Sequence, residues 1–205
     1  MSYLLSVVVG DPVHVWVAPA GAEPRAAAHN LLLDLASTLI SSPSLHHDSD
    51  GRPHVPGLAV SLSHTHDLVV VAAAADGPIG VDVEELHPRE VRELANRWFA
   101  PEELDWMSTQ SSQLKAFLLL WTAKEAVGKA LGRGLRQSGL RRPMPLGGGA
   151  VESEPSLLVT YVPWKYAVLA VAAPIGLTEI VVRHETALRS VERSRTSLPV
   201  VVRGN

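Results

Sequence analysis

Two short segments of the chain carry side chains whose types and spacing suit metal and phosphate chemistry. The first contains Asp82 and Glu84, and the second contains Glu125 and Lys129. Side chains of a β-strand alternate between its two faces, so Asp82 and Glu84 are expected on one face. Glu125 and Lys129 lie one helical turn apart and would share one face of a helix. The two segments therefore offer three carboxylates and one ammonium group.

Carboxylates that lie close together repel each other unless one is protonated or a cation lies between them. Mg²⁺ suits such a set, because it takes one or two carboxylates and completes its octahedron with water and phosphate oxygens. Asp82, Glu84 and Glu125 are thus candidate metal ligands beside a phosphate-bearing substrate. Each segment alone also has an ordinary structural explanation, as a solvated strand face or as a Glu–Lys helix pair worth roughly 0.2–0.5 kcal/mol.

Five motifs follow one another around these residues. They are Gly51-Arg52-Pro53, Ser61-Leu62-Ser63-His64-Thr65, Ile79-Gly80-Val81-Asp82-Val83-Glu84, Arg97-Trp98-Phe99-Ala100-Pro101-Glu102-Glu103 and the segment from Trp121 to Lys129. Their order resembles that of the 4′-phosphopantetheinyl transferases over roughly residues 51 to 135. The likeness is closer to the long, surfactin-synthetase-activating branch than to the short, trimeric holo-acyl-carrier-protein synthases.

The resemblance implies an α+β fold of two similar halves, related by a pseudo-two-fold axis, with coenzyme A in the cleft between them. We expect an N-terminal half at residues 1–88 and a C-terminal half at residues 89–205, with a tail after about residue 186 that frays. The sequence itself shows no strong residue-level repeat. The two-fold axis is therefore implied by the resemblance alone.

Apolar periodicity and the positions of Gly and Pro predict the individual elements. Helices are expected at 25–39, 90–98, from 101 onward and at 114–131. Strands are expected at 4–9, 13–17, 58–62, 68–75, 79–83, 156–162, 166–173 and 178–182, with loops at 41–57 and 136–149.

The activity implied by the resemblance is transfer of the 4′-phosphopantetheine arm of coenzyme A to a serine of an acyl or peptidyl carrier protein. Adenosine 3′,5′-bisphosphate is released. Asp82, Glu84 and Glu125 match the family's metal ligands, and Mg²⁺, or Mn²⁺ in vitro, would neutralise charge on the pyrophosphate. Lys129 would add a second positive charge, and Glu125 is the candidate base for the serine proton. A carboxylate that fully coordinates a metal ion is not easily a strong base as well. The role of Glu125 as a metal ligand therefore ranks above its role as a base.

The resemblance also implies contacts to coenzyme A, from Arg52, Ser63, His64, Asp82, Lys124 and Lys129. Arg52 stands where the family motif has Lys, and its planar fork binds phosphate differently from the point charge of a lysine. His64 alone would more often be a structural histidine. Glu103 follows Phe99 in the family motif, and it could equally be a first-turn residue that complements a helix dipole.

The chain departs from the family at the first helix. Members generally carry Arg there, in a stretch like His-Arg-x-Leu-Leu, whereas this chain has Asn30 after His29. Arg25 is the cation left nearby. Losing a charge-assisted hydrogen bond costs about 1.5–3 kcal/mol, which would raise KM tenfold or more. The alternative function is therefore a catalytically weak paralogue that docks carrier proteins, although the retained carboxylates and Lys129 argue against it.

Five histidines crowd one region and raise the question of a zinc site. They are His46, His47, His54, His64 and His66. Neutral imidazoles bind Zn²⁺ readily, yet this spacing fits no compact ligand pattern, so solvated histidines are the favoured interpretation.

For an acidic carrier protein, we expect a basic and apolar rim, formed by residues 98–107 and by Arg133, Arg136, Arg141 and Arg142.

Length, composition and charge limit the classes of protein to which the chain can belong. With 205 residues and 46% hydrophobic content, the chain can bury a core as one domain or two small ones. A net charge of −3 argues against a nucleic-acid partner. The absence of cysteine excludes disulfides and thiolate chemistry.

The apolar run at 4–9 lacks a basic leader, and no apolar run approaches the ~20 residues of a membrane span. We expect a cytoplasmic monomer that serves an unspecified fatty-acid, polyketide or peptide synthase.

Overall fold

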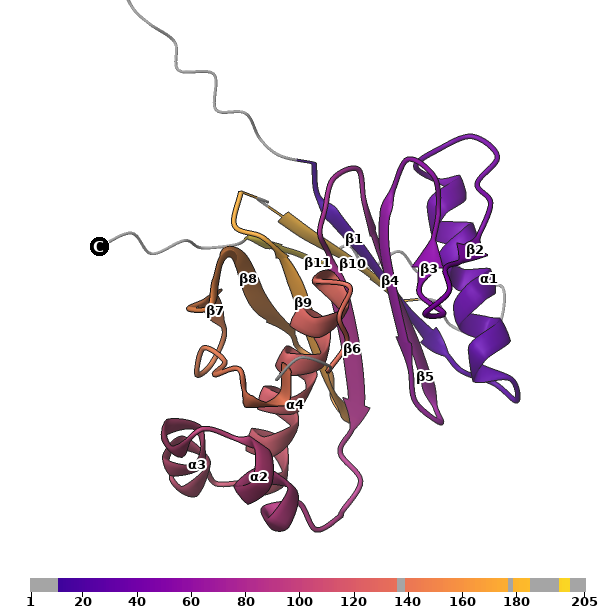
Figure 1. The fold of residues 1–205 in the computed structure, drawn as a ribbon. Helices are drawn as coiled ribbons and strands as arrows, with labels where there is room; N and C mark the ends of the chain where they lie inside the picture. Colours follow the sequence, from indigo (N-terminus) through magenta and orange to yellow (C-terminus); the bar gives the residue numbers. More distant parts are fainter. Residues whose placement is uncertain (1–10, 136–138, 177–178, 185–195, 200–205) are drawn as a thin grey trace, which may run out of the picture.

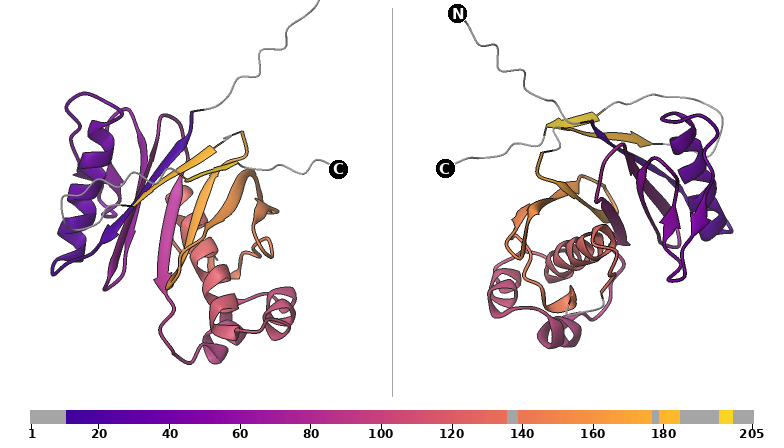
Figure 2. Two further views of the ribbon diagram at one scale, coloured as in Figure 1. Left: turned by 180° about the vertical axis from the view of Figure 1, so that it is seen from behind. Right: turned by 45° about the horizontal axis from the view of Figure 1, so that its top comes forward.

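The structure is a computed structural model that describes residues 11–135, 139–176, 179–184 and 196–199. The strand predicted at 4–9 lies outside these residues. Two β-sheets pack face to face, and each carries one long helix on its outer face (Figure 1, Figure 2). This mixture of packed helices and sheets confirms the predicted α+β class.

The first sheet has the strand order β11-β10-β1-β5-β4. Its strands are β1 (Val13–Pro19), β4 (Ala59–His64), β5 (Leu68–Ala74), β10 (Glu179–His184) and β11 (Thr196–Pro199). Strand β1 pairs with β5 in antiparallel and with β10 in parallel orientation. Helix α1 (Pro24–Ser37) covers the outer face, where Leu32 and Leu35 are fully buried against Val69 and Val71.

The second sheet is antiparallel, with the order β6-β9-β8-β7. Its strands are β6 (Gly80–Glu85), β7 (Gly149–Val151), β8 (Glu154–Val162) and β9 (Ala167–Pro174). Helix α4 (Gln113–Ala130) lies along the outer face, with the short helices α2 (Arg92–Trp98) and α3 (Pro101–Ser108) beside it (Figure 1). A 3-10 turn at Gly139–Arg141 follows.

The inner faces of the two sheets share one apolar core. Val15 and Val70 of the first sheet lie in it together with Val81, Val83 and Leu169 of the second. Because strand side chains alternate, Asp82 and Glu84 point to the other face of β6, toward α4. The alternation predicted for this segment is confirmed.

Gly80 explains how closely β6 approaches α4. A Cβ atom at this position would lie 1.9 Å from the carbonyl oxygen of Ala126, which no side chain could accommodate. The absence of a side chain lets the strand rest on the helix backbone. This contact brings the acidic face of β6 against the helix that carries Glu125 and Lys129.

Several predicted elements differ in detail from the observed ones. Residues 41–57 were predicted as a loop, but they contain a small hairpin of β2 (His46–His47) and β3 (Pro53–His54). Strand β7 lies partly in the predicted loop at 136–149, and Thr196–Pro199 pairs with β10 although a frayed tail was predicted there. Pairing across the sheet stabilises these short segments, and a local pattern does not reveal such pairing.

Strand pairing does not follow the predicted division at residue 88. Strand β6 precedes it and pairs with β9 in the second sheet, whereas β10 follows it and pairs with β1 in the first. Each sheet therefore contains strands from both sides, and the two halves at 1–88 and 89–205 stay a prediction. In the described part of the chain, no helix has the length and hydropathy needed to span a bilayer.

Candidate functional site

Asp82 lies where three elements meet. Its Oδ1 accepts a hydrogen bond of 2.7 Å from the hydroxyl of Ser63 on β4 and one of 2.7 Å from the ammonium of Lys129 on α4. The Lys129 ammonium also donates to the Val81 carbonyl at 3.1 Å. Asp82 is only 5% exposed. Both side-chain donors reach the same oxygen, so among the described residues Oδ2 keeps its capacity for another ligand.

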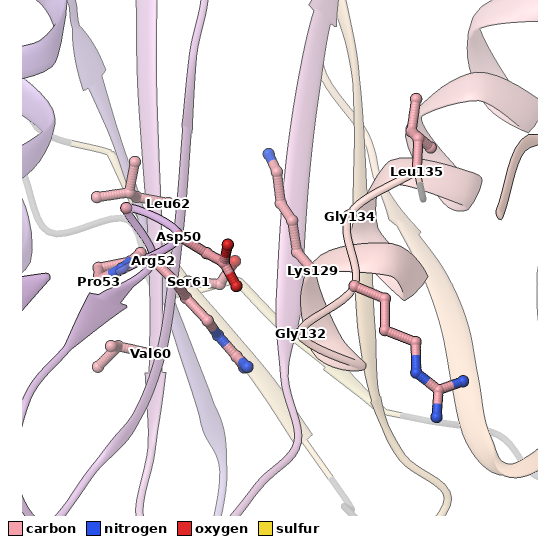
Figure 3. Close-up of a pocket in the computed structure, with 12 residues that line it drawn as sticks. Asp50, Arg52, Pro53, Val60, Ser61, Leu62, Lys129, Gly132, Gly134 and Leu135 are labelled. Atoms are coloured by element: carbon pink, nitrogen blue, oxygen red, sulfur yellow. The ribbon is translucent and has the colours of Figure 1, made fainter. Parts of the chain in front are cut away.

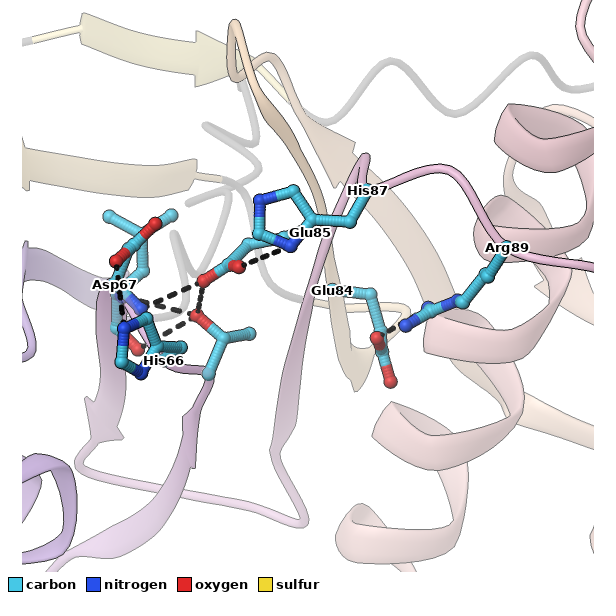
Figure 4. A network of polar contacts seen from close by, with 8 residues as sticks. His66, Asp67, Glu84, Glu85, His87 and Arg89 are labelled. Atoms are coloured by element: carbon cyan, nitrogen blue, oxygen red, sulfur yellow. Dashed lines mark hydrogen bonds and ion pairs between the residues drawn. The ribbon is translucent and has the colours of Figure 1, made fainter.

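Glu84 forms an ion pair that the sequence did not predict. An Nη2 of Arg89 lies 2.7 Å from its Oε2 (Figure 4). The Arg89 side chain is 43% exposed, and surface pairs of this kind contribute about 0–1 kcal/mol. A stronger ligand could therefore displace Arg89 from Glu84 at little cost.

Glu125 is the carboxylate whose ionisation is most disturbed. Burial raises its pKa, the negative charges of Asp82 and Glu84 raise it further, and Lys129 opposes them, which leaves the pKa at about 7. Among the described residues, no hydrogen bond reaches its side chain. Its repulsion with the two carboxylates of β6 places all three in one electrostatic group. Near neutral pH, Glu125 can therefore take up or release a proton.

The donor set fits a hard divalent cation. Asp82, Glu84 and Glu125 are all carboxylates, and each keeps at least one oxygen without a hydrogen bond in the described part of the chain. Oxygen ligands of this kind suit Mg²⁺. Among the described residues, these three carboxylates do not form a group at metal-ligand spacing. Lys129 pairs with Asp82, and Arg89 pairs with Glu84.

A second group of side chains does lie at such spacing. Ligand atoms of Asp67, Glu85 and His87 all lie within 4.8 Å of one another. Glu85 accepts hydrogen bonds from the Thr65 hydroxyl and, at 2.9 Å, from the Asp67 backbone, and His87 lies 3.2 Å away (Figure 4). Burial alone would raise the pKa of Glu85, but these hydrogen bonds and His87 lower it. The sequence analysis missed this network, because its members form no motif.

A cavity of about 480 Å³ opens beside Lys129. The β2–β3 turn and β4 line one side of it, and the end of α4 and the glycine-rich turn after it line the other (Figure 3). Arg52 reaches across, since a Cβ atom on Gly132 would lie 2.3 Å from its Nη1. Arg52 and Lys129 thus give the cavity positive charge from both sides.

The predicted Ser63-His64 step lies at the far end of β4. Ser63 is buried and holds Asp82, as described above. His64 is exposed and lines a smaller cavity of about 320 Å³ together with Asp82, Glu84 and Arg89. Asp82 lines the smaller cavity, and its hydrogen-bond partner Lys129 lines the larger one. The two cavities are therefore neighbours, and together they contain Arg52, Ser63, His64, Asp82 and Lys129.

The predicted contact of Lys124 with coenzyme A phosphates requires a correction. The Lys124 side chain is fully buried, and its ammonium lies 2.7 Å from Glu103 Oε1. Burial lowers its pKa, while the hydrogen bond and charge of Glu103 raise it. Lys124 points about 100° away from Glu125 around the axis of α4, which directs it toward Glu103. It supports α4 rather than lining either cavity.

The predicted histidine region contains no compact zinc site. His46, His47, His54, His64 and His66 are all exposed, and no set of them reaches metal-ligand spacing among the described residues. Solvated histidines, the favoured interpretation, agree with this arrangement.

Comparison with known proteins shows which family this site resembles. The family model described as the 4′-phosphopantetheinyl transferase superfamily matches residues 78–146, which include Asp82, Glu84, Glu125 and Lys129. The 4′-phosphopantetheinyl transferase psf-1 of Bacillus pumilus is 31% identical over 55% of this chain and 58% of that protein. Over this segment, the chain is therefore similar to 4′-phosphopantetheinyl transferases.

Two further relatives extend the match within the superfamily. The 4′-phosphopantetheinyl transferase gsp of Aneurinibacillus migulanus is 34% identical over 42% of this chain and 36% of that protein. A putative 4′-phosphopantetheinyl transferase of Haemophilus influenzae is 27% identical over 86% of this chain and 76% of that protein. The matches to psf-1 and gsp thus cover between about a third and three fifths of those relatives.

Proposed function

We propose that this chain transfers the 4′-phosphopantetheine arm of coenzyme A to the serine hydroxyl of an apo acyl or peptidyl carrier protein. Adenosine 3′,5′-bisphosphate is the second product. The observation that supports this most strongly is the meeting of Ser63, Asp82, Glu125 and Lys129 at the junction of β4, β6 and α4. The match of residues 78–146 to the superfamily model supports the same reaction.

Coenzyme A would lie in the cavity beside Lys129, with its pyrophosphate near the junction. Arg52 contacts phosphate from the β2–β3 side, and Lys129 provides positive charge from α4. Asp82 accepts a hydrogen bond from the Lys129 ammonium and is itself held by the Ser63 hydroxyl. Positive groups fixed in advance stabilise charge that develops as the phosphate ester bond breaks.

Glu125 is suited to accept the proton of the attacking serine. Its pKa of about 7 means that a substantial fraction is ionised at neutral pH and still basic enough to take a proton. The serine oxygen forms a bond to the β-phosphorus, and the bond from that phosphorus to the bisphosphate oxygen breaks. Lys129 stays close to the leaving phosphate and offsets its negative charge.

Asp82, Glu84 and Glu125 would hold a divalent cation, Mg²⁺ or in vitro Mn²⁺. When bound, such an ion supplies Lewis-acid neutralisation of the pyrophosphate. The ligand role of Glu125 ranks above its role as a base, because a carboxylate that fully coordinates a cation is a weak base. Arg89 would leave Glu84 when the ion enters.

An acidic carrier protein would dock near Trp98. The guanidinium of Arg97 lies 5.1 Å and that of Arg141 5.6 Å from the Trp98 ring, and both arginines are exposed. Arg142 is a poorer candidate than the sequence suggested, because its side chain is only 12% exposed and lies 3.8 Å from Glu154. Arg133 is exposed, and Arg136 lies outside the described residues. The cytoplasmic location, the monomeric state and the absence of nucleic-acid or membrane partners stay predictions.

Intact mass spectrometry tests the proposed function. Purified protein, coenzyme A and Mg²⁺ are incubated with a panel of apo carrier proteins from fatty-acid, polyketide and peptide synthases. We expect a phosphopantetheine mass gain on at least one carrier, lost in Asp82→Ala and Glu125→Ala. Carrier binding without any mass gain would instead support the alternative, a docking module.

A further inference from the structure

Three side chains of metal-binding types come together beside the site described above. Asp67 belongs to the segment between β4 and β5, Glu85 is the last residue of β6, and His87 follows two residues later. One ligand atom from each lies within 4.8 Å of the other two (Figure 4). None of these residues of the Asp67–Glu85–His87 group is among the three carboxylates proposed to hold Mg²⁺. The group is therefore a separate candidate site.

Hydrogen bonds fix the two segments that carry this group. The Asp67 N–H donates to Glu85 Oε1 at 2.9 Å, and the Thr65 hydroxyl donates to the same oxygen. Just after β6, the Leu86 N–H donates to the Tyr166 carbonyl at 2.9 Å. The ligand-bearing residues thus start from a fixed backbone, which reduces the ordering cost of binding a common ion.

The two carboxylates of the group lack a strong cationic partner. The Glu85 side chain is only 10% exposed, and its Oε2 lies 3.2 Å from His87 Nδ1. Asp67 Oδ1 lies 3.8 Å from His66 Nε2. In the described part of the chain, no lysine or arginine forms an ion pair with either carboxylate. A buried carboxylate is costly without firm neutralisation, so a bound cation would relieve this cost.

The mixture of ligand atoms decides which cation suits the group. Mg²⁺ takes oxygen ligands, whereas an imidazole nitrogen suits Zn²⁺ and other first-row transition ions. Zinc sites that admit solvent use three His, Asp or Glu ligands and complete their coordination with water. Asp67 and His87 have side chains that are 64% and 67% exposed, so water can reach an ion between them. The group therefore favours Zn²⁺, unlike the all-carboxylate set of Asp82.

The spacing of the group is close to that of a bound ion. Two ligand atoms that each lie about 2.0–2.2 Å from one Zn²⁺ are at most about 4.4 Å apart. The observed limit of 4.8 Å is slightly larger. Because Asp67 and His87 are exposed, small rotations of their side chains can close this difference while Glu85 stays in place.

We propose that Asp67, Glu85 and His87 form a second metal site, which binds Zn²⁺ in preference to Mg²⁺. The proposal goes beyond the proposed function, because it involves neither coenzyme A nor a carrier protein. Asp67 precedes β5 of the first sheet and Glu85 ends β6 of the second, so an ion held by both connects the two sheets. Such an ion binds the folded chain better than the unfolded chain and therefore stabilises the fold.

Equilibrium dialysis followed by metal analysis tests this site. Metal-free protein without a histidine tag is dialysed against Zn²⁺ in the presence of about a hundredfold excess of Mg²⁺. We expect the wild-type protein to retain one Zn²⁺ per chain at this site. His87→Ala and Asp67→Asn should each weaken Zn²⁺ binding at least tenfold, because each removes one of three ligands. Both side chains are exposed, so both variants should keep the fold.

Two control variants assign the bound ion to this group. Glu125→Gln removes a carboxylate of the set proposed for Mg²⁺, and His54→Ala removes an exposed histidine of β3, which pairs with another histidine on β2. Both variants should retain Zn²⁺ as the wild type does. Zn²⁺ should also raise the Tm of the wild-type protein and leave that of His87→Ala unchanged.

Four results would overturn the proposal. They are no Zn²⁺ bound by the wild-type protein, displacement of Zn²⁺ by Mg²⁺, undiminished binding in both His87→Ala and Asp67→Asn, and loss of binding in His54→Ala. The last result would assign the ion to the histidines of the β2–β3 hairpin. The readouts are bound metal and Tm, so the outcome does not depend on whether the chain modifies a carrier protein.

Discussion

Lys124 and Glu103 form a buried ion pair that connects helices α3 and α4. The Lys124 ammonium lies 2.7 and 2.8 Å from the two carboxylate oxygens of Glu103, and the side chains are 0% and 1% exposed. Glu103 also accepts backbone N–H groups from Ala100 and Met144, both at 2.9 Å, and Lys124 donates to the Arg142 carbonyl. The pair thus fixes α3 and the segment after the 3-10 turn to the helix that carries Glu125.

Breaking this pair should destabilise the fold without weakening contact to coenzyme A. Glu103→Gln and Lys124→Met each leave a buried group without its partner, which costs about 3–5 kcal/mol. The double variant should lose less than the sum of the two, because the partners interact directly. Urea unfolding of the two single variants and the double variant measures these losses of stability. If Lys124→Met kept its stability but bound coenzyme A tenfold more weakly, Lys124 would contact phosphate after all.

The raised pKa of Glu125 predicts how stability depends on pH. The folded protein keeps the Glu125 proton up to a pKa of about 7, whereas the unfolded chain releases it near the ordinary value of 4.5. Between these values the folded state binds more protons, so this group's contribution to stability falls as the pH rises.

Urea unfolding from pH 5 to pH 8, without divalent ions, measures this contribution. Glu125→Gln should lack the decline and be more stable than wild type at pH 8, by about 1 kcal/mol after allowance for solvent screening. Equal pH profiles for the two proteins would mean that Glu125 ionises normally.

Gly132 should be needed for the position of Arg52. Its φ of +68° disfavours any other residue, and an added Cβ atom would displace the Arg52 guanidinium. Gly134 provides a matched control, since its φ is +54° but nothing lies within 4 Å of an added Cβ atom.

Alanine at either glycine should cost about 1 kcal/mol of stability. We expect only Gly132→Ala to raise the KM for coenzyme A, about tenfold, because a charge-assisted contact to phosphate is lost. Steady-state kinetics of both variants make the comparison, and an equal KM in the two would argue against a phosphate contact by Arg52.

The exposed Arg141 should assist the docking of an acidic carrier protein. Arg141→Gln is expected to lower kcat/KM for the carrier several-fold at low salt while leaving coenzyme A affinity unchanged, since rim charges act mainly on association. The deficit should shrink at high salt, where the charges are screened. Lys165→Gln, a change to an exposed cation outside the proposed docking region, serves as a control. A deficit that does not depend on salt would point to a structural effect instead.

Local periodicity predicted those parts of the site that lie within one element. Strand alternation placed Asp82 and Glu84 on one face, and the helical repeat placed Glu125 and Lys129 one turn apart. The burial of Lys124 was not predictable, because its partner Glu103 lies on another helix and meets it only through packing. The same reason applies to the pairing of β10 with β1, since the two strands are distant in the sequence.

The contact between His29 and His47 shows another limit of sequence patterns. Each residue looks like an ordinary surface histidine within its own segment, and only the folding of the β2–β3 hairpin against α1 brings the rings together. Arg89 similarly belongs to a loop with no motif, yet it neutralises Glu84. These features depend on tertiary contacts rather than on local propensity.

Calorimetric titration of Mg²⁺ into the coenzyme A complex at pH 7.5 tests the central claim most directly. The account predicts that Asp82→Asn, Glu84→Gln and Glu125→Gln each weaken Mg²⁺ binding at least tenfold, about 1.4 kcal/mol, because each removes a charged ligand. Glu85→Gln, a change in the neighbouring Asp67–Glu85–His87 group, should leave it unchanged. Loss of Mg²⁺ binding in Glu85→Gln, with normal binding in the other three variants, would contradict the account.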